Sequence, residues 1–285
     1  MLVNLNEIFK IANERKIAIG AFNVPNVSML RTVISAAESL KLPVIIQHTE
    51  GHNHLITMDE IAPIMIHYAK KSSVPVCVHL DHGTSVSDCN KAIDLGFTSV
   101  MYDGSALDFG GNISGTQKVV SLAKRNNVTV EAELGQMLNS TIGGGEGVEY
   151  TSSDYHYTEV SDAIEFVDKT KVDCLAVAIG TMHGIYLEKP KLNLARIKEI
   201  DEAIHVPIVL HGGSGLEVHE YQTAVKNGVR KINYYTYMNK TGGEEIALLI
   251  KQNKEYEFFD ELLLHAEKAM FENIQYFMKI ISNQA

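Results

Sequence analysis

Short apolar runs rich in Val and Ile recur along the chain and alternate with stretches of helical periodicity. The runs predict eight β-strands, at residues 17–22, 44–49, 76–80, 99–102, 128–133, 174–179, 208–211 and 229–233. Apolar residues spaced three and four apart predict helices between them, near residues 27–41, 57–71, 113–126, 161–169 and 193–203. Strand and helix therefore alternate along most of the chain.

Prolines at the starts of three predicted strands reveal a repeat. Pro43, Pro75 and Pro207 each stand before a Val or Ile, where the missing N–H of proline costs least. The first two lie 32 residues apart and the last two lie 132 apart. A unit of about 33 residues, the size of one βα repeat, fits both intervals. The 285-residue chain holds eight such units and a remainder.

The strand composition favours a closed barrel over an open, doubly wound sheet. A nearly continuous apolar strand such as residues 174–179 suits a parallel sheet that is covered on both faces. With eight repeats, the pattern predicts an α/β fold, the (β/α)8 or TIM barrel, which fills about 250 residues as one domain. We expect residues 1–285 to form one such domain, with residues 255–285 as a C-terminal helical extension.

Composition narrows the function classes. Lys and Arg number 25 and Asp and Glu number 35, so the net charge is −10, which argues against nucleic-acid or membrane partners but not against a small anion pocket. The sequence shows no secretory signal and no apolar stretch of about 18 residues, so we expect a cytoplasmic protein. Cys77, Cys89 and Cys174 lack paired spacing and are typical of buried thiols in a reducing compartment rather than of catalytic nucleophiles.

Polar side chains cluster where the predicted strands end, which is where barrels of this class build their sites. These residues are Asn23, Thr49, Asp81, His82, Asp103, Glu133, His183, His211 and Asn233. Each of the three histidines is followed by a Gly, which lets a ligand or backbone approach closely. Three imidazoles suit catalytic zinc, which keeps a position open for substrate. The alternative is that these histidines are structural, since loops are polar in any barrel.

Six longer stretches extend this pattern. They are Gly20-Ala21-Phe22-Asn23-Val24, His79-Leu80-Asp81-His82-Gly83, Val130-Glu131-Ala132-Glu133-Leu134-Gly135, Ala176-Val177-Ala178-Ile179-Gly180-Thr181-Met182-His183-Gly184, Leu210-His211-Gly212-Gly213-Ser214-Gly215-Leu216 and Lys231-Ile232-Asn233. They resemble the class II, zinc-dependent ketose-bisphosphate aldolases, which include the fructose- and tagatose-bisphosphate enzymes. The resemblance covers most of the chain and implies aldol cleavage of a ketose phosphate to dihydroxyacetone phosphate and an aldehyde such as glyceraldehyde 3-phosphate.

The resemblance assigns the metal ligands. It implies that His82, His183 and His211 hold Zn²⁺, with Asp103 and Glu133 at a second or alternative metal position. Zinc binds the carbonyl and hydroxyl oxygens of dihydroxyacetone phosphate and accepts electron density from them, so no Schiff-base lysine is required. No lysine stands at the predicted strand ends.

The resemblance also assigns acid/base residues. Asp81 resembles the group that handles the hydroxyl proton at the breaking bond, and its alternative role is to orient a metal ligand. His79, two residues earlier, is interpreted as a packing or ligand-orienting residue. Glu146, on a Gly-rich connection from residue 134 to 158, resembles a mobile-loop glutamate that exchanges the proton on the dihydroxyacetone phosphate carbon. The alternative is a solvated flexible loop, and Gly147 stands where the family commonly has another acid.

A phosphate site is expected after strands seven and eight, the common phosphate position of this fold. Backbone N–H groups and hydroxyls there suit an anion despite the negative net charge. By resemblance, a monovalent cation (Na⁺ or K⁺) sits beside the phosphorylated triose. The expected substrate-binding residues are Gly184, Gly212, Gly213, Ser214, Asn233, Tyr234, Tyr235 and Thr236, together with Asn23 and Thr49.

The far end of the substrate departs from the family pattern. Tyr235 stands where the family usually has a small residue or Asp, and no Arg follows Arg230. Lys240 or Lys268 would substitute only partly, because an ammonium lacks the bidentate geometry of Arg. The interpretation is therefore a homodimeric or homotetrameric class II aldolase for fructose 1,6-bisphosphate or tagatose 1,6-bisphosphate, or for a different ketose 1-phosphate. Two further alternatives are a metal-dependent hydrolase and a barrel that senses sugar phosphates.

Overall fold

The computed structural model describes residues 1–135, 138–139, 157–252 and 258–284. Eight parallel strands close into a barrel in the order β4-β3-β2-β11-β10-β8-β6-β5, with β5 returning to β4. A short strand, β1 (Leu2–Val3), adds to β4, and a two-stranded pair joins β7 (Leu138–Asn139) to β9 (Met182–His183). The barrel strands are β2 (Ile19–Asn23), β3 (Val44–Thr49), β4 (Val76–Gly83), β5 (Ser99–Tyr102), β6 (Thr129–Leu134), β8 (Cys174–Val177), β10 (Ile208–Leu210) and β11 (Val229–Asn233).

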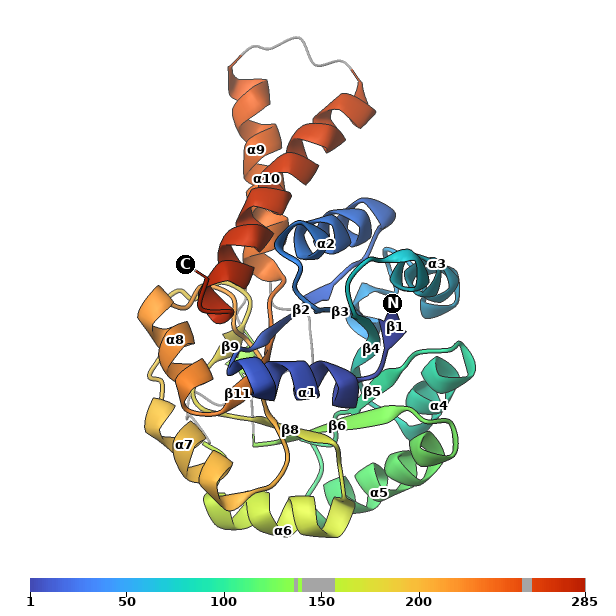
Figure 1. The fold of residues 1–285 in the computed structure, drawn as a ribbon, viewed down its shortest axis with the longest axis vertical. Coiled ribbons are helices and arrows are strands. Elements are labelled where there is room, and N and C mark those ends of the chain that lie inside the picture. Colours follow the sequence, from blue (N-terminus) through green and yellow to red (C-terminus); the bar gives the residue numbers. More distant parts are fainter. Residues whose placement is uncertain (136–137, 140–156, 253–257, 285) are drawn as a thin grey trace.

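Helices surround this barrel, as Figure 1 shows. They are α1 (Leu5–Arg15), α2 (Val27–Leu40), α3 (Met58–Lys71), α4 (Val86–Asp94), α5 (Phe109–Arg125), α6 (Val160–Thr170), α7 (Leu194–Ala203), α8 (Val218–Lys226), α9 (Thr236–Lys251) and α10 (Phe259–Ile281), with a 3-10 turn η1 (Glu50–His52). The predicted TIM barrel and its five predicted helices are confirmed. Within the described ranges, none of these helices is both long and apolar enough to cross a membrane. The assignment of the whole chain to one domain stays a prediction.

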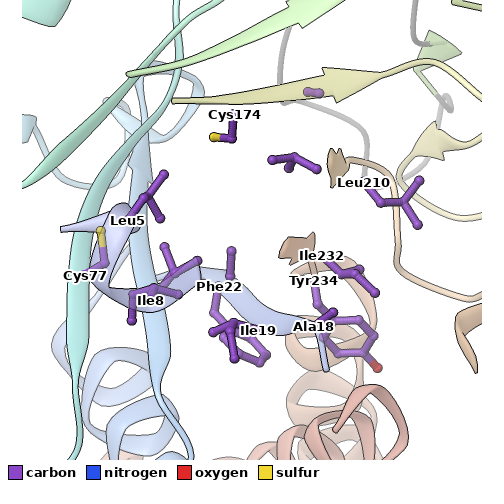
Figure 2. Packing of buried hydrophobic residues seen from close by; sticks show 14 of the residues in the cluster. Leu5, Ile8, Ala18, Ile19, Phe22, Cys77, Cys174, Leu210, Ile232 and Tyr234 are labelled. Atoms are coloured by element: carbon purple, nitrogen blue, oxygen red, sulfur yellow. The ribbon is translucent and has the colours of Figure 1, made fainter. Parts of the chain in front are cut away.

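Helix α1 covers the N-terminal end of the barrel. Its start is fixed by a capping box, in which Asn4 accepts from the N–H of Glu7 and Glu7 accepts from the N–H of Asn4, so two of the donors at this helix end are satisfied. Leu5 and Ile8 are fully buried and lie near Cys77 of β4 at the base of the barrel (Figure 2). The opposite end, where the strands finish, is the end that carries the polar cluster.

Strand β8 is shorter than the sequence predicts. The apolar run continues to Ile179, but the strand ends at Val177. Beyond it, Ala178 exchanges hydrogen bonds with Thr158, its N–H donating to the hydroxyl and its carbonyl accepting from the Thr158 N–H, each at 2.9 Å. The chain therefore leaves the sheet at this point and carries the segment with His183 over the barrel mouth.

The C-terminal helix is anchored on the barrel by aromatic packing. Helices α9 and α10 pack together and extend beyond the barrel outline in Figure 1, and α10 also packs on α2. Phe277 stacks on Tyr234 with ring centroids 4.0 Å apart and meets Phe22 and Tyr221 edge-on at 5.8 and 5.4 Å. The expected helical extension is thus α10, which begins at Phe259.

Replacing Phe277 with Ala is expected to lower the free energy of unfolding by about 3–5 kcal/mol, because a fully packed aromatic ring is lost and a cavity remains. Tyr276, the residue before Phe277 on α10, has 60% of its surface exposed. Tyr276→Ala is therefore the matched control and should change the free energy of unfolding by about 0.5 kcal/mol or less. Urea unfolding of both variants measures the difference. Equal effects would show that the aromatic cluster does not anchor α10.

Candidate metal centre and active site

Buried polar side chains on or directly after seven barrel strands, together with one from β9, converge at the C-terminal end of the barrel. All nine predicted strand-end residues lie here and are almost fully buried, with exposed fractions of 4% or less: Asn23, Thr49, Asp81, His82, Asp103, Glu133, His183, His211 and Asn233. So many polar groups in one buried place require partners, and their partners define what the site can do.

Strand β4 is irregular where it delivers two of these side chains. Neighbouring residues of a regular strand point to opposite faces, yet both Asp81 and His82 reach the barrel mouth. His82 has a left-handed backbone with φ of 50°, and the β4–β5 register shifts between Leu80 and Gly83. A non-glycine residue in this region is uncommon. The local twist therefore places a carboxylate and an imidazole side by side.

Carboxylates fix the ring orientations of His82 and His211. Nδ1 of His82 lies 2.8 Å from Asp103 Oδ2, and Nε2 of His211 lies 2.7 Å from Glu131 Oε1. Because an ionised carboxylate only accepts, each of these nitrogens carries the hydrogen. The remaining nitrogens, His82 Nε2 and His211 Nδ1, face each other at 2.9 Å. Two lone pairs at this distance require a cation between them, either a proton or a metal ion.

Electrostatics of the apo site agree with this requirement. Burial acts to lower the pKa of His82, but the negative charges of Asp81 and Asp103 outweigh it and raise the pKa to about 10. Burial lowers the pKa of His211 well below its ordinary value, and the positive charge of His82 lowers it further. One proton is therefore held between two imidazoles, at a place where a metal ion could replace it.

The third histidine completes a metal-binding geometry. His183 on β9 has its ring centroid 5.0 Å from that of His82 and 6.0 Å from that of His211. The three histidines each offer a nitrogen within 4.8 Å of the others, and all three are buried. Three neutral imidazole ligands are the donor set of catalytic zinc sites. The triad fits a metal ion.

Asp103 and Glu133 form a second candidate group with His82, within the same 4.8 Å limit. In the part of the chain that the structure describes, Glu133 Oε2 has no hydrogen-bond partner, although it is buried and lies 3.9 Å from both His82 and His211. Burial and the nearby charge of Asp103 raise the pKa of Glu133 well above its ordinary value. A buried oxygen without a partner beside two imidazoles leaves an acceptor for a cation.

Asp81 is held beside this triad by two amides. Asn23 Nδ2 donates to Asp81 Oδ2 at 2.9 Å, and Asn233 Nδ2 donates to Oδ1 at 3.0 Å. The Asn233 nitrogen also lies 3.5 Å from His211 Nδ1, so Asp81 adjoins the metal ligands. Burial acts to raise the pKa of Asp81, but the nearby positive charge, that of His82 first, outweighs it and lowers the pKa to about 2. The side chain is therefore ionised at neutral pH.

A glycine-rich turn and a helix start adjoin the site after β10 and β11. Gly212 has φ of 61°, and a Cβ there would lie 2.5 Å from the Met182 carbonyl oxygen, so only glycine lets the turn pass this close to β9. Ser214 Oγ accepts from the N–H of Tyr235 at 3.1 Å, which ties the turn to the start of α9. Among the described residues, no side chain caps α9. The N–H groups of its first turn therefore remain available to an anion.

Comparison with known proteins decides the family. The family model described as fructose-bisphosphate aldolase class-II matches residues 3–285 of the chain. The chain belongs to the class II fructose-bisphosphate aldolase family. It is also 37% identical over 268 residues to the protein YdjI of Escherichia coli K12, described as uncharacterized, covering 94% of this chain and 91% of that one. A probable fructose-bisphosphate aldolase of Bacillus subtilis is 38% identical over 240 residues, covering 82% and 81%.

Solved structures agree on the fold of this class II aldolase. The crystal structure of the YdjI aldolase from Escherichia coli K12 matches with a TM-score of 0.85 at 35% identity, over 99% of this chain and 97% of that chain. The fructose-bisphosphate aldolase of Campylobacter jejuni matches with a TM-score of 0.81 at 21% identity, over 99% and 96%. At this low identity, the match to the Campylobacter jejuni structure supports the fold only. The predicted family is confirmed by these comparisons.

Some residues predicted to bind substrate in the aldolase have other partners in the structure. The ring of Tyr234 packs on Phe277, its hydroxyl donates to Asn273 Oδ1 at 3.0 Å and its N–H donates to Ala21 at 2.8 Å. The Tyr234 side chain is thus directed to α10, and its expected contact with substrate stays untested. Thr49 accepts from the N–H of Gly51 at 3.4 Å, at the start of η1.

Three further predicted site residues are Gly184, Thr236 and Glu146, of which the structure describes the first two. Gly184 directly follows His183 and has φ of 90°, a left-handed backbone that favours glycine. Thr236 is the first residue of α9. Glu146, the expected loop acid, lies outside the described residues.

Sequence reasoning missed two charged residues beneath the metal ligands. Glu131 on β6 and Lys231 on β11 are both fully buried and form an ion pair of 2.8 Å inside the aldolase barrel. Their signal was present in the sequence, because each lies two residues before a predicted site residue, Glu133 or Asn233, and so on the same face of its strand. A charged residue is almost never fully buried unless it is paired.

Proposed function

We propose that this class II aldolase catalyses metal-dependent, reversible aldol cleavage of a ketose phosphate to dihydroxyacetone phosphate and an aldehyde. The observation that carries the proposal is the contact chain from His211 through Asn233 to Asp81, with separations of 3.5 and 3.0 Å. Through these contacts, the ionised carboxylate of Asp81 lies next to the three histidines that are proposed to bind the metal ion. An acid/base group beside a metal site is what aldol chemistry needs.

We propose Zn²⁺ as the ion, held by His82, His183 and His211, with Asp103 and Glu133 as a second or alternative position. A bound divalent ion would supply Lewis-acid polarisation of the substrate carbonyl and its neighbouring hydroxyl. The protein's own contribution is to orient the ligand nitrogens toward one another, so that a metal ion can take the place of the proton held between them. The hydrogen bonds from His82 to Asp103 and from His211 to Glu131 support this assignment.

Asp81 is assigned as the base in the cleavage direction. It accepts the proton of the hydroxyl group on the carbon that becomes the aldehyde, and it returns that proton in the condensation direction. Asn23 and Asn233 hold its two oxygens in place, so the carboxylate is oriented before substrate arrives. Glu146 is assigned, by resemblance alone, to the proton on the dihydroxyacetone phosphate carbon.

The phosphate of the triose is assigned to the turn Gly212–Ser214 and the first turn of α9. Helix α9 has 16 residues and no described side chain caps its start. Its first turn and the glycine turn together offer N–H groups and the positive end of a helix dipole. This site needs no cluster of basic residues, which agrees with a net charge of −10. The adjacent Na⁺ or K⁺, an assembly of two or four copies and a cytoplasmic location stay predictions.

The far end of the substrate is proposed to lack a second phosphate. The ring of Tyr235 lies against His52, with centroids 4.9 Å apart, so a bulky aromatic pair stands where the family usually has a small residue or Asp. Arg230 is directed to Asn13 and to the carbonyls of Val225 and Val229. Lys240 pairs with Glu244 on the surface of α9. None of these groups supports a distal phosphate site.

We expect the enzyme to cleave a ketose 1-phosphate with higher kcat/KM than fructose 1,6-bisphosphate or tagatose 1,6-bisphosphate. A bisphosphate would bring a second dianion to a place where the described residues supply no arginine fork. Retro-aldol rates on the three substrate types, followed by release of dihydroxyacetone phosphate, measure the preference. A strong preference for either bisphosphate would overturn the proposal for the far end and leave the aldolase assignment intact.

A further inference from the structure

A buried ion pair lies one layer below the metal ligands, inside the barrel. Lys231 Nζ donates to Glu131 Oε2 at 2.8 Å, and both side chains have no exposed surface. Glu131 precedes Glu133 by two residues and Lys231 precedes Asn233 by two, so each lies on the inward face of its strand, directly below a residue of the site. Barrel interiors of this fold are filled mainly by branched apolar side chains. In this barrel, the ion pair therefore occupies positions that apolar side chains usually fill.

The position of the pair links it to one metal ligand. In the sheet order β11-β10-β8-β6, the strand β10 lies between Lys231 on β11 and Glu131 on β6. His211 directly follows β10, and its Nε2 lies 2.7 Å from Glu131 Oε1. The two oxygens of Glu131 are thus divided, one to His211 and one to Lys231. Lys231 fixes the carboxylate that fixes the imidazole.

A gain in folding stability is a weak explanation for the buried Glu131–Lys231 ion pair. Removing two charges from water costs several kcal/mol, and replacing a buried pair by apolar residues of similar volume is often neutral or stabilising. Cys174 Sγ is a further donor to Glu131 Oε2, at 3.7 Å, so donors surround the carboxylate. A carboxylate surrounded in this way has one orientation and can accept only, which is the property needed to hold an imidazole N–H.

We propose that Glu131 and Lys231 are positioning residues for metal binding: they hold His211 in the tautomer and ring orientation that directs Nδ1 at the ion. The inference rests on the metal site of the proposed function. Without the carboxylate, the His211 ring is free to rotate and to carry its hydrogen on Nδ1, which would block that nitrogen as a ligand. Partners of this kind typically change metal affinity by about 10- to 100-fold.

The decisive variant is the double replacement Glu131→Leu with Lys231→Met. It removes both charges and keeps apolar volume in the barrel, so it leaves no unpaired charge. Single variants Glu131→Gln and Lys231→Met provide independent measurements. Thr170→Val is the control: Thr170 is buried on α6 and donates to the Phe166 carbonyl at 2.6 Å, and no described contact joins it to Glu131, Lys231 or His211.

Affinity for Co²⁺ and Zn²⁺ is measured by competition with a chromophoric chelator, and the visible absorption of the Co²⁺ form reports the ligand geometry. Circular dichroism of the apo protein checks the fold. We expect about 10- to 100-fold weaker binding and an altered Co²⁺ spectrum in the double variant and in Glu131→Gln. Thr170→Val should keep the wild-type affinity and spectrum. Wild-type affinity and spectrum in a folded double variant or a folded Glu131→Gln would overturn the positioning role. A wild-type protein that binds neither ion would remove the metal site itself.

Discussion

Replacing Asp81 with Ala is expected to lower the rate of dihydroxyacetone phosphate formation by about 10²- to 10⁴-fold, the range that a positioned acid/base group contributes. The carboxylate adjoins the triad without bonding a histidine in the described contacts, and two amides orient it. Asp81 hydrogen-bonds these amides and none of the three histidines among the described contacts. The variant should therefore keep wild-type metal content, measured by elemental analysis beside the kinetic assay.

Asp81→Asn separates chemistry from packing, because it keeps the size of the side chain and loses its ability to take up a proton at neutral pH. It should lose activity to a similar degree. Asp94→Ala is the matched control, since Asp94 is an exposed carboxylate at the end of α4 on the same βα unit. A sugar-phosphate sensor would bind ligand equally well in all three variants. Wild-type turnover in Asp81→Ala would show that another group moves the proton.

Much of the barrel could be predicted because its signals are local. Strands β3, β5 and β11 begin and end at the predicted residues, and each contains the Val or Ile that favours a strand. The cluster of polar residues at the strand ends followed from the fold itself. Helix α1 was not predicted, because only four of its eleven residues are buried and six are polar, so its stability depends on the barrel end that it covers.

The details that make the site work depend on contacts between distant segments. His82 lies inside β4, beyond the predicted strand end at residue 80, and adopts φ of 50° where the pairing with β5 shifts register. The direction of the Tyr234 ring is set by Phe277, which lies 43 residues further along the chain. Glu131 and Lys231 are 100 residues apart, and only barrel closure brings them together. A single sequence shows the residue types but not these pairings.

The central claim is that the buried histidine triad holds the metal ion on which carbon–carbon cleavage depends. The triad fits such an ion because carboxylates on Asp103 and Glu131 leave two imidazole nitrogens 2.9 Å apart with their lone pairs facing. A Lewis acid contributes several kcal/mol to the transition state. This corresponds to a rate loss on the order of 10³-fold when the ion is removed.

The most direct measurement is the rate of dihydroxyacetone phosphate formation before chelation, after complete metal removal confirmed by elemental analysis, and after addition of Zn²⁺. The account predicts that activity falls on the order of 10³-fold on removal and returns when one equivalent of metal is bound. Undiminished activity in protein shown to be free of metal would contradict it.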